Sequence, residues 1–244
     1  MNKKKSKWFL QVLAASFALL LASIGAHGQS SSPTSNHDVL IIGSSSVNGA
    51  LGHIIENELR KVGFQPLRYA RSSSGFARPD FFDWEAEIPR LGPLRNLKAV
   101  IVYAGGNDGQ ALRLREQEIP EEIRKDPRKR RQAEWIQWND AARWSAVYEA
   151  RVRSFINALC AGGVRRVLVL LPTEGENRHW TERMERIQSL QASATQGTQC
   201  GRVIDPRGVR LKEGSTMDGI HLSRSGAQAV WEHIKGAILN ALRN

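Results

Sequence analysis

The chain has 244 residues, a formal net charge of +11 at pH 7 and two cysteines. Its length suits one domain with a sizeable core rather than two domains. The positive charge favours anionic partners such as acidic glycans, lipid headgroups or cell-wall polymers, without identifying one of them.

The N-terminal segment has the order of regions that is typical of a secretory signal peptide. Four lysines between residues 3 and 7 precede an apolar run over residues 8–24, and small residues follow at 25–28. We predict a signal peptide over residues 1–28, cleaved after Gly28, because Ala26 and Gly28 occupy the small-residue positions of a cleavage site. The alternative is an uncleaved anchor, although a bilayer span needs about 20 apolar residues.

Export would place the protein in the periplasm or outside the cell, with no stable transmembrane span after processing and no nucleic acid as a partner. Residues 29–36 form a polar linker, and residues 37–244 form the predicted domain. Four lysines and no acidic residue leave with the signal peptide, so the formal charge falls from +11 to +7.

Five short apolar runs predict the strands of a parallel sheet. They cover residues 38–42, 65–70, 99–103, 167–171 and 203–204. Apolar residues at helical spacing predict helices over 51–62 and 144–159, and a last helix after Ser223. This alternation indicates an α/β fold, a three-layer α/β/α sandwich with helices on both faces of the sheet. Ligands of such sheets bind at the carboxyl ends of the strands.

Residues 111–143 interrupt the alternation of strands and helices. The segment is highly charged, includes a basic run from Arg124 to Arg131, and contains Trp135 and Trp138. It is either a solvated helical insertion whose tryptophans pack on the domain, or a lid that offers cations and aromatic rings to a substrate. Connections of this length inside a compact domain are often functional.

Cys160 and Cys200 each precede a predicted strand by a few residues. If those two strands are neighbours in the sheet, both cysteines lie at the same end of it. In an oxidising compartment we therefore expect a disulfide, which closes about 40 residues and contributes on the order of 4 kcal/mol through loop entropy. Two buried free thiols are the alternative, and nothing indicates a catalytic thiol.

A serine-rich turn, residues 43–46, follows the first predicted strand and precedes a helix. A serine there faces solvent at the carboxyl end of the sheet, and the N–H groups of the helix favour a developing oxyanion. The turn matches neither the G-x-S-x-G nucleophile elbow nor a G-x-G-x-x-G phosphate loop. On its own, such a turn is more often a helix cap than the site of a nucleophile.

Further polar residues follow the later strands. Gly75 comes after the second strand and Asn107 after the third, where an N–H and a side-chain amide are neutral donors for an oxyanion. Asp218 and His221 lie before the last helix. An Asp three residues before a His can fix its tautomer, so that the His takes the proton of a serine. The alternative is a capping Asp beside an exposed His.

Four blocks together resemble the SGNH/GDSL hydrolase family. They are IGSS at 42–45, SG at 74–75, GGND at 105–108 and DGIH at 218–221, and the resemblance extends from Val39 to about Ile234. The strings RPDFFDW at 78–84 and NDGQ at 107–110 are similar to a bacterial exported subfamily of mostly unassigned function. The resemblance implies the SGNH hydrolase fold, with a flavodoxin-like five-stranded parallel sheet in the order 2-1-3-4-5.

The resemblance also implies a role for each residue. Ser45 is the expected nucleophile, His221 the general base, and Asp218 the residue that orients His221. The N–H groups of Ser45 and Gly75 and the Asn107 side chain are the expected oxyanion hole. No cofactor is required.

The family usually has Asp at the position of Ser44. That Asp is not the triad carboxylate, so its replacement need not abolish activity, but it leaves three adjacent serines as candidates for the nucleophile.

Other polar and aromatic residues have weaker assignments. Arg78, Trp135 and Trp138 are candidates for substrate binding, and a structural ion pair is the alternative for Arg78. Asp80 and Asp83 are expected to brace the turn after the second strand. No metal site is expected, because no H-E-x-x-H motif occurs and no metal-ligand spacing connects His37, His53, His179 and His233.

We expect a serine esterase whose substrate is a small ester or an acylated glycan of the envelope or the extracellular space, with acetyl as the favoured acyl group. This choice follows from the predicted export, the positive charge and the family resemblance, not from pocket residues. Three alternatives remain open. They are a periplasmic glycan O-acyltransferase with the same triad, a catalytically inactive glycan-binding protein, and a basic protein that binds an anionic envelope polymer through residues 124–131.

Overall fold

The structure is a computed structural model that describes residue 34 and residues 36–243. The predicted signal peptide and most of the linker therefore lie outside the described residues. In chain order the elements are β1 Val39–Gly43, α2 Ser45–Asn48, α3 Ala50–Lys61, β2 Pro66–Ala70, α4 Trp84–Glu87, η1 Ile88–Arg90, η2 Leu94–Asn96, β3 Ala99–Tyr103, β4 Leu112–Arg113, η3 Glu116–Glu118, α5 Glu121–Arg124, α6 Pro127–Ala133, β5 Trp135–Ile136, α7 Ala141–Ala161, β6 Val167–Leu170, α8 Arg178–Gln196, β7 Gly201–Ile204 and α9 Arg224–Arg243. Among these described helices, none has both the length and the hydrophobicity that crossing a bilayer requires.

Five strands form one parallel sheet in the order β2-β1-β3-β6-β7. Counted along the chain, this is the predicted order 2-1-3-4-5. The central strands β1, β3 and β6 are buried along their whole length, as expected for strands covered on both faces. In the register of the sheet, Gly43 of β1 lies between Ala70 of β2 and Tyr103 of β3. The segments that follow these three strands therefore begin side by side.

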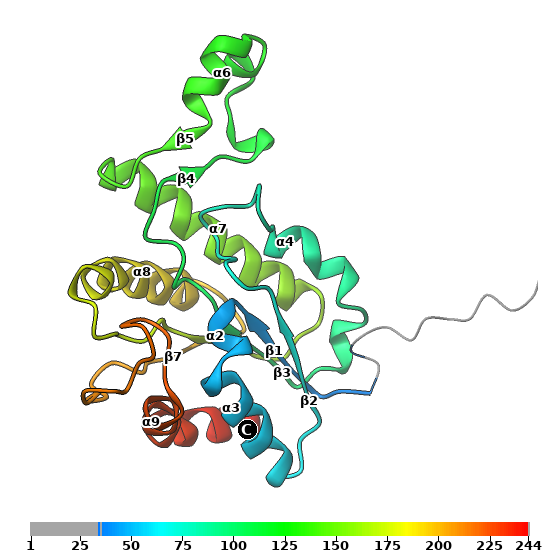
Figure 1. The fold of residues 1–244 in the computed structure, drawn as a ribbon. Coiled ribbons are helices and arrows are strands. Elements are labelled where there is room, and N and C mark those ends of the chain that lie inside the picture. Colours follow the sequence, from blue (N-terminus) through cyan, green and yellow to red (C-terminus); the bar gives the residue numbers. More distant parts are fainter. Residues whose placement is uncertain (1–33, 35, 244) are drawn as a thin grey trace, which may run out of the picture. The chain divides into compact units, whose positions relative to one another are not determined.

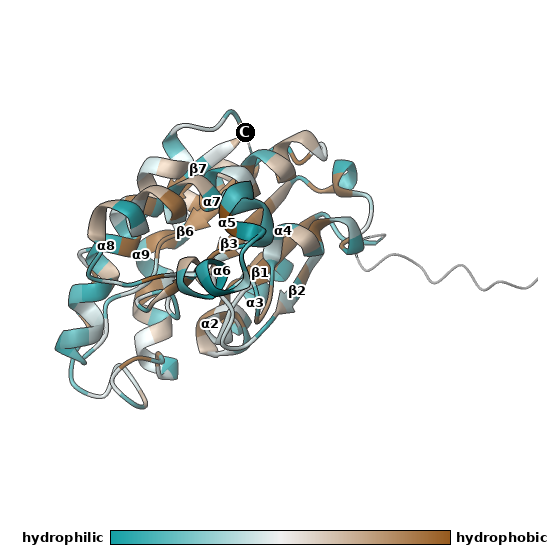
Figure 2. Ribbon diagram, turned by 90° about the horizontal axis from the view of Figure 1, so that it is seen from above, coloured by the Kyte–Doolittle hydropathy of each residue, from teal (hydrophilic) through white to brown (hydrophobic). Residues whose placement is uncertain are grey.

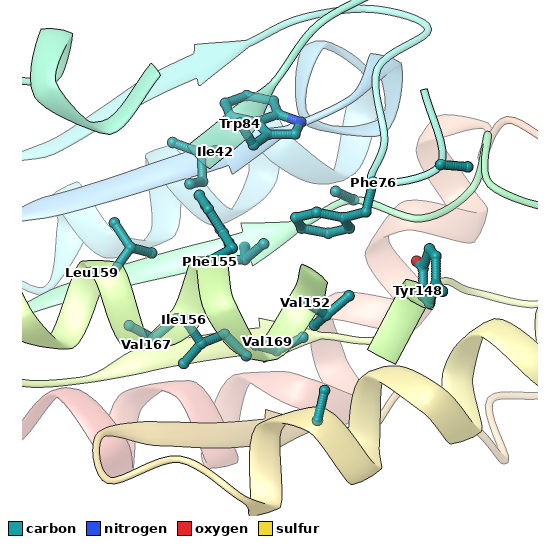
Figure 3. Close-up of a cluster of buried hydrophobic side chains, with 14 of the residues drawn as sticks. Ile42, Phe76, Trp84, Tyr148, Val152, Phe155, Ile156, Leu159, Val167 and Val169 are labelled. Carbon is teal, nitrogen blue, oxygen red and sulfur yellow. The ribbon is translucent and has the colours of Figure 1, made fainter. Parts of the chain in front are cut away.

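Alternate residues of the strands pack into two cores, one on each face of the sheet. Along β1, Leu40 and Ile42 belong to the core that includes α7 and α8, whereas Val39 and Ile41 belong to the core that includes α3 and α9. Figure 1 shows these helix pairs on opposite sides of the sheet, and Figure 2 shows hydrophobic strands between more hydrophilic helices. In Figure 3, side chains of β1, β6 and α7 meet in the first of these cores. The predicted three-layer sandwich is confirmed.

The sequence patterns predicted no helix between the strands at 167–171 and 203–204, but α8 lies there. Met184 and Ile187 are buried on its inner face, and Gln188 and Gln191 are buried beside them. Because glutamines occupy part of this face, few apolar residues mark the helix in the sequence.

The charged segment after residue 110 combines a small sheet with short helices. β4 and β5 pair as antiparallel strands, with η3, α5 and α6 between them. Helix α7 already begins at Ala141, so the insertion ends before residue 143. Trp138 packs edge-on against Trp144 of α7, and the Arg186 guanidinium of α8 lies 4.0 Å from the centre of its ring. This tryptophan therefore packs on the domain, and strands as well as helices form the insertion.

Cys160 and Cys200 form the predicted disulfide, with their Cα atoms 5.8 Å apart. Because β6 and β7 are parallel neighbours, the residues that precede them lie at the same end of the sheet. The bond joins two residues 40 positions apart and encloses β6 and α8. Loop entropy makes its expected contribution to the free energy of unfolding on the order of 4 kcal/mol.

Candidate active site

Gly43 ends β1 at a position that leaves no room for a side chain. A Cβ atom built there would lie 1.9 Å from the carbonyl oxygen of Tyr103, and the φ of Gly43 is +156°. The N–H of Ser44 donates to the same carbonyl at 3.3 Å, and α2 begins at the next residue. This sharp turn places Ser45 just beyond the carboxyl end of β1.

Ser45, His221 and Asp218 form a continuous chain of hydrogen bonds. Ser45 Oγ lies 3.1 Å from His221 Nε2, although 176 positions separate the two residues in the sequence. His221 Nδ1 lies 2.7 Å from Asp218 Oδ2. Asp218 Oδ1 accepts hydrogen bonds from the N–H groups of Ile220 at 3.0 Å and His221 at 2.7 Å. One carboxylate thus holds both the backbone of this turn and the imidazole ring.

The turn also keeps Asp218 ionised. Hydrogen bonds from the His221 backbone N–H and then from its ring lower the pKa of Asp218 to about 2. An ionised carboxylate only accepts hydrogen bonds, so in the neutral imidazole of His221 the proton is on Nδ1 and Nε2 presents a lone pair to the Ser45 hydroxyl. His221 is therefore oriented to take the proton of Ser45.

The three adjacent serines have different surroundings. Ser44 is 2% exposed, and the Ser46 hydroxyl hydrogen-bonds the Tyr103 side chain. Among the described residues, Ser45 is the serine whose hydroxyl meets an imidazole. Because the carboxylate that holds His221 belongs to Asp218, the hydrogen-bond chain does not depend on an Asp at position 44.

Residues 74–77, called here the Gly75 turn, follow β2 and are buried. The Asn107 side-chain amide donates to the Ser74 carbonyl at 3.0 Å, so the structure brings two predicted oxyanion donors together. A Cβ atom at Gly75 would lie 2.0 Å from Asp108 Oδ1, which requires glycine at this position. No hydrogen bond within the described part of the chain uses the Gly75 N–H. The roles of Gly75 and Asn107 toward an oxyanion stay a prediction.

Asp108 has no role in the sequence-based prediction, but it anchors the Gly75 turn. It is 1% exposed and accepts hydrogen bonds from Phe76 N–H, Ala77 N–H and the Tyr148 hydroxyl, each at 2.9 Å. Burial raises the pKa of Asp108, and these donors together with Arg151 act in the opposite direction. The sequence did offer a sign of this role: Asp108 follows soon after a buried strand, and a buried carboxylate there has to be paired with hydrogen-bond donors.

A pocket of about 230 Å³ opens beside Ser45 and His221. Trp180 forms one wall, and its indole Nε1 donates to the Gly106 carbonyl at 3.1 Å. Among the described residues that line the pocket there is no Lys, Arg, Asp or Glu and no residue of the insertion. The remaining apolar lining consists of Ala50, Leu51, Ala104, Pro172, Met217, Ile220 and Leu222.

Arg78, Trp135 and Trp138 do not line this pocket. Arg78 pairs with Asp80 at 2.8 Å, and its guanidinium lies 4.8 Å from the centre of the Trp135 ring. Asp83 accepts hydrogen bonds from the first N–H groups of α4. Asp80 and Asp83 therefore brace the turn after β2, and Arg78 takes part in an ion pair. The substrate-binding role of Arg78 and the two tryptophans stays a prediction.

The structure offers no grouping for a metal ion among residues 34 and 36–243. No three His, Cys, Asp or Glu side chains come together there in a way that could hold one.

A family model described as "Protein of unknown function (DUF459)" matches residues 38–216. The matched range contains Ser45, Gly75 and Asn107, and it ends just before Asp218 and His221. The comparison with curated proteins finds no match.

Several solved structures share the fold. A carbohydrate esterase family 3 protein from Talaromyces cellulolyticus is 12% identical with a TM-score of 0.56, and the match covers 84% of this chain and 97% of that one. A family 3 carbohydrate esterase from Clostridium thermocellum is 13% identical with a TM-score of 0.54, covering 85% and 99%. An acetyl esterase mutant with an acetate ion is 13% identical with a TM-score of 0.53, covering 84% and 97%. Identities this low show a common fold, which is the SGNH hydrolase fold that the sequence blocks predicted.

The hydrogen bonds of Asp218 lead to a first prediction. In the wild type, Asp218 should titrate with a pKa of about 2, below the ordinary value of about 3.9. The stabilisation from its hydrogen bonds is therefore complete above about pH 4 and is lost as the pH falls toward 2. In His221→Ala the ring is gone but the backbone N–H remains, so the pKa should rise only part of the way. Carbon-13 NMR of the carboxyl group measures both values. A wild-type pKa near 3.9, or one that His221→Ala does not raise, would contradict the geometry.

Proposed function

We propose that this chain, which belongs to the family described as "Protein of unknown function (DUF459)", is a serine esterase that works through an acyl-enzyme on Ser45. The observation that carries the proposal is the hydrogen-bond chain from Ser45 through His221 to Asp218. A nucleophile, a base and a carboxylate that orients the base, in this order, are what ester cleavage by a serine requires. The fold that the chain shares with solved esterases supports the same reaction.

In the first step, Ser45 Oγ attacks the carbonyl carbon of the ester while its proton moves to His221 Nε2. The carbonyl electrons move onto the oxygen and give a tetrahedral oxyanion. Asp218 stabilises the imidazolium through the Nδ1–H hydrogen bond. When the bond to the alcohol oxygen breaks, Nε2 returns the proton to that oxygen, and the acyl group stays on Ser45. Water then attacks the acyl-enzyme by the same proton transfers and releases the acid.

The oxyanion needs donors that are in place before the reaction. We assign this role to the N–H groups of Ser45 and Gly75 and to the Asn107 amide. Asn107 uses one amide hydrogen on the Ser74 carbonyl, which leaves the other for a substrate oxygen. Removal of one such donor costs about 100- to 1,000-fold in kcat in enzymes of this mechanism.

For the substrate we propose an O-acyl ester of an envelope or extracellular glycan. Two of the similar structures are carbohydrate esterases and a third is an acetyl esterase, which supports this class. The predicted export and the positive charge of the chain agree with an acylated envelope polymer. Acetyl is the acyl group that the sequence-based prediction favours.

The pocket beside Ser45 favours a longer acyl chain than acetyl. Its volume of about 230 Å³ is larger than the cavity of about 150 Å³ in which an engineered protein holds benzene, so an acetyl group would leave most of it empty. Its walls include Leu51, Trp180 and Ile220, and no Lys, Arg, Asp or Glu is among the described residues that line it. Because sugar hydroxyls are polar, the apolar part of a glycan ester is its acyl chain. We therefore propose an acyl group of more than two carbons.

The nucleophile assignment is tested by substitution of each serine. On a small activated acetate ester, Ser45→Ala and His221→Ala should each lower kcat by about a thousandfold or more, because attack and proton transfer are lost. Ser44→Ala and Ser46→Ala are the matched controls and should stay within about fivefold of the wild type. A fluorophosphonate probe should label the wild type and the two controls but not Ser45→Ala.

Folded wild-type protein that neither hydrolyses the ester nor takes up the probe would remove the esterase proposal and favour the inactive glycan-binding alternative. If Ser45→Ala keeps full activity and Ser44→Ala or Ser46→Ala loses it, the nucleophile is that neighbouring serine and not Ser45. Free acid as the product, rather than an acylated glycan when an acceptor is added, separates hydrolysis from acyl transfer.

The acyl pocket is tested with esters of one sugar alcohol that differ only in the acyl chain, from acetyl to octanoyl. Each added methylene that enters the pocket should raise kcat/KM by about fourfold, which corresponds to ~0.8 kcal/mol of apolar burial. Ala50→Leu narrows the pocket and should shift the preferred chain to a shorter one. A wild type that prefers acetyl, with kcat/KM falling at each added carbon, would contradict a long acyl group.

A further inference from the structure

Arg151 of α7 is a cation that is only 2% exposed. Its guanidinium Nη1 donates to the carbonyl oxygens of Phe76 at 2.9 Å and Ala77 at 3.4 Å. Its Nη2 donates to the carbonyl oxygen of Arg113 in β4 at 2.5 Å. The buried charge therefore holds the backbone of the Gly75 turn and joins it to the first strand of the insertion.

The counter-charge of Arg151 comes from the insertion. Arg151 Nε donates to Glu118 Oε1 at 2.8 Å, and Nη2 pairs with Glu118 Oε2. The Glu118 carboxylate is itself fixed, since it accepts a hydrogen bond from the Arg115 N–H at 2.6 Å. Glu118 lies in η3, directly after β4. The insertion and the Gly75 turn are also joined directly, because the Arg113 N–H donates a hydrogen bond to the Ala77 carbonyl oxygen at 2.9 Å.

The same turn is held from the side of the α/β core. Asp108 binds the N–H groups of Phe76 and Ala77, and Arg151 binds their carbonyl oxygens. The Phe76 ring also packs edge-on against Tyr148, with ring centres 6.2 Å apart (Figure 3). The backbone next to Gly75 is therefore fixed by the Asp108 carboxylate from the core and by the Arg151 guanidinium, which pairs with Glu118.

We propose that Glu118, acting through Arg151, is a positioning residue for the Gly75 N–H, so that the insertion serves the reaction by fixing the oxyanion hole. This inference rests on the proposed function, because the position of that N–H matters only if an oxyanion forms beside it. Without the Glu118 charge, Arg151 loses the carboxylate that it hydrogen-bonds and keeps only the charge of Asp108, with which it makes no ion pair, so it gains by moving toward water. The carbonyl groups of the turn then lose a donor, and the Gly75 peptide loses its fixed orientation.

Glu118→Gln tests this role, because it keeps the shape of the side chain and removes the charge. We expect kcat on an activated ester to fall by about 10- to 100-fold with KM within about twofold, because an oxyanion donor acts in the transition state and not on the bound ester. Glu116→Gln is the matched control. Glu116 lies in the same short helix but is about half exposed and pairs with Arg130. Its kcat should equal that of the wild type.

Two further readouts separate positioning from a general loss of stability. The affinity for a boronic acid, whose adduct with Ser45 carries an oxyanion-like oxygen, should fall in Glu118→Gln by about the same factor as kcat. The shape of the pH profile of kcat/KM should not change, because Glu118 contacts none of Ser45, His221 and Asp218. Glu118→Asp keeps the charge on a shorter side chain and should give an intermediate kcat.

Wild-type kcat and boronate affinity in Glu118→Gln would overturn the proposal, whatever the variant does to the melting temperature. If Glu118→Gln does not fold, Glu118→Asp is measured instead. A kcat equal to that of the wild type in Glu118→Asp would then overturn the proposal. In each of these outcomes the wild type still hydrolyses the ester. Inactive wild-type protein would instead remove the proposed function itself.

Discussion

Neighbouring strands of a parallel sheet end at the same edge, and the candidate site depends on this constraint. β1 lies between β2 and β3, so the segments that carry Ser45, Gly75 and Asn107 leave the sheet next to one another. Gly43 makes the arrangement possible, because any Cβ atom there would collide with the Tyr103 carbonyl. With a side chain at position 43, the serine turn would have to move away from the sheet edge on which the other two segments converge.

The groups in this region differ in burial according to what they do. His221 and Asp218 have side chains that are 41% and 53% exposed, so the imidazole that faces Ser45 is open to solvent. Asp108 and Arg151 are 1% and 2% exposed, and each makes two hydrogen bonds to backbone groups of the Gly75 turn. Burial raises the pKa of Asp108 and contributes most to the raised pKa of Tyr148. The buried groups therefore hold the backbone, while the exposed pair places an imidazole beside the Ser45 hydroxyl.

The site residues that could be predicted from the sequence are those that stand in a short, recognisable pattern. A serine at a strand end and an Asp three residues before a His are visible in the sequence, and the structure joins Ser45, His221 and Asp218 by hydrogen bonds. The order of the strands followed from the family resemblance, and the disulfide followed from the position of each cysteine shortly before an apolar run.

Other parts of the site left no such pattern. The pocket wall at Trp180 belongs to α8, whose inner face is partly glutamine and so contains few apolar residues. The contact between Glu118 and Arg151 joins residues 33 positions apart, and it depends on how the insertion folds back onto α7. Charged residues are frequent in both segments, so nothing in the sequence distinguishes this pair from its neighbours.

Trapping the acyl-enzyme intermediate is the most direct test of the claim that Ser45 carries the acyl group. Wild-type protein is mixed with an activated ester, quenched in acid, digested and sequenced by tandem mass spectrometry. We expect the acyl group on Ser45, at a level that rises before steady state and disappears as the ester is consumed. An acyl group on Ser44 or Ser46, or hydrolysis without any acylated serine, would contradict the mechanism.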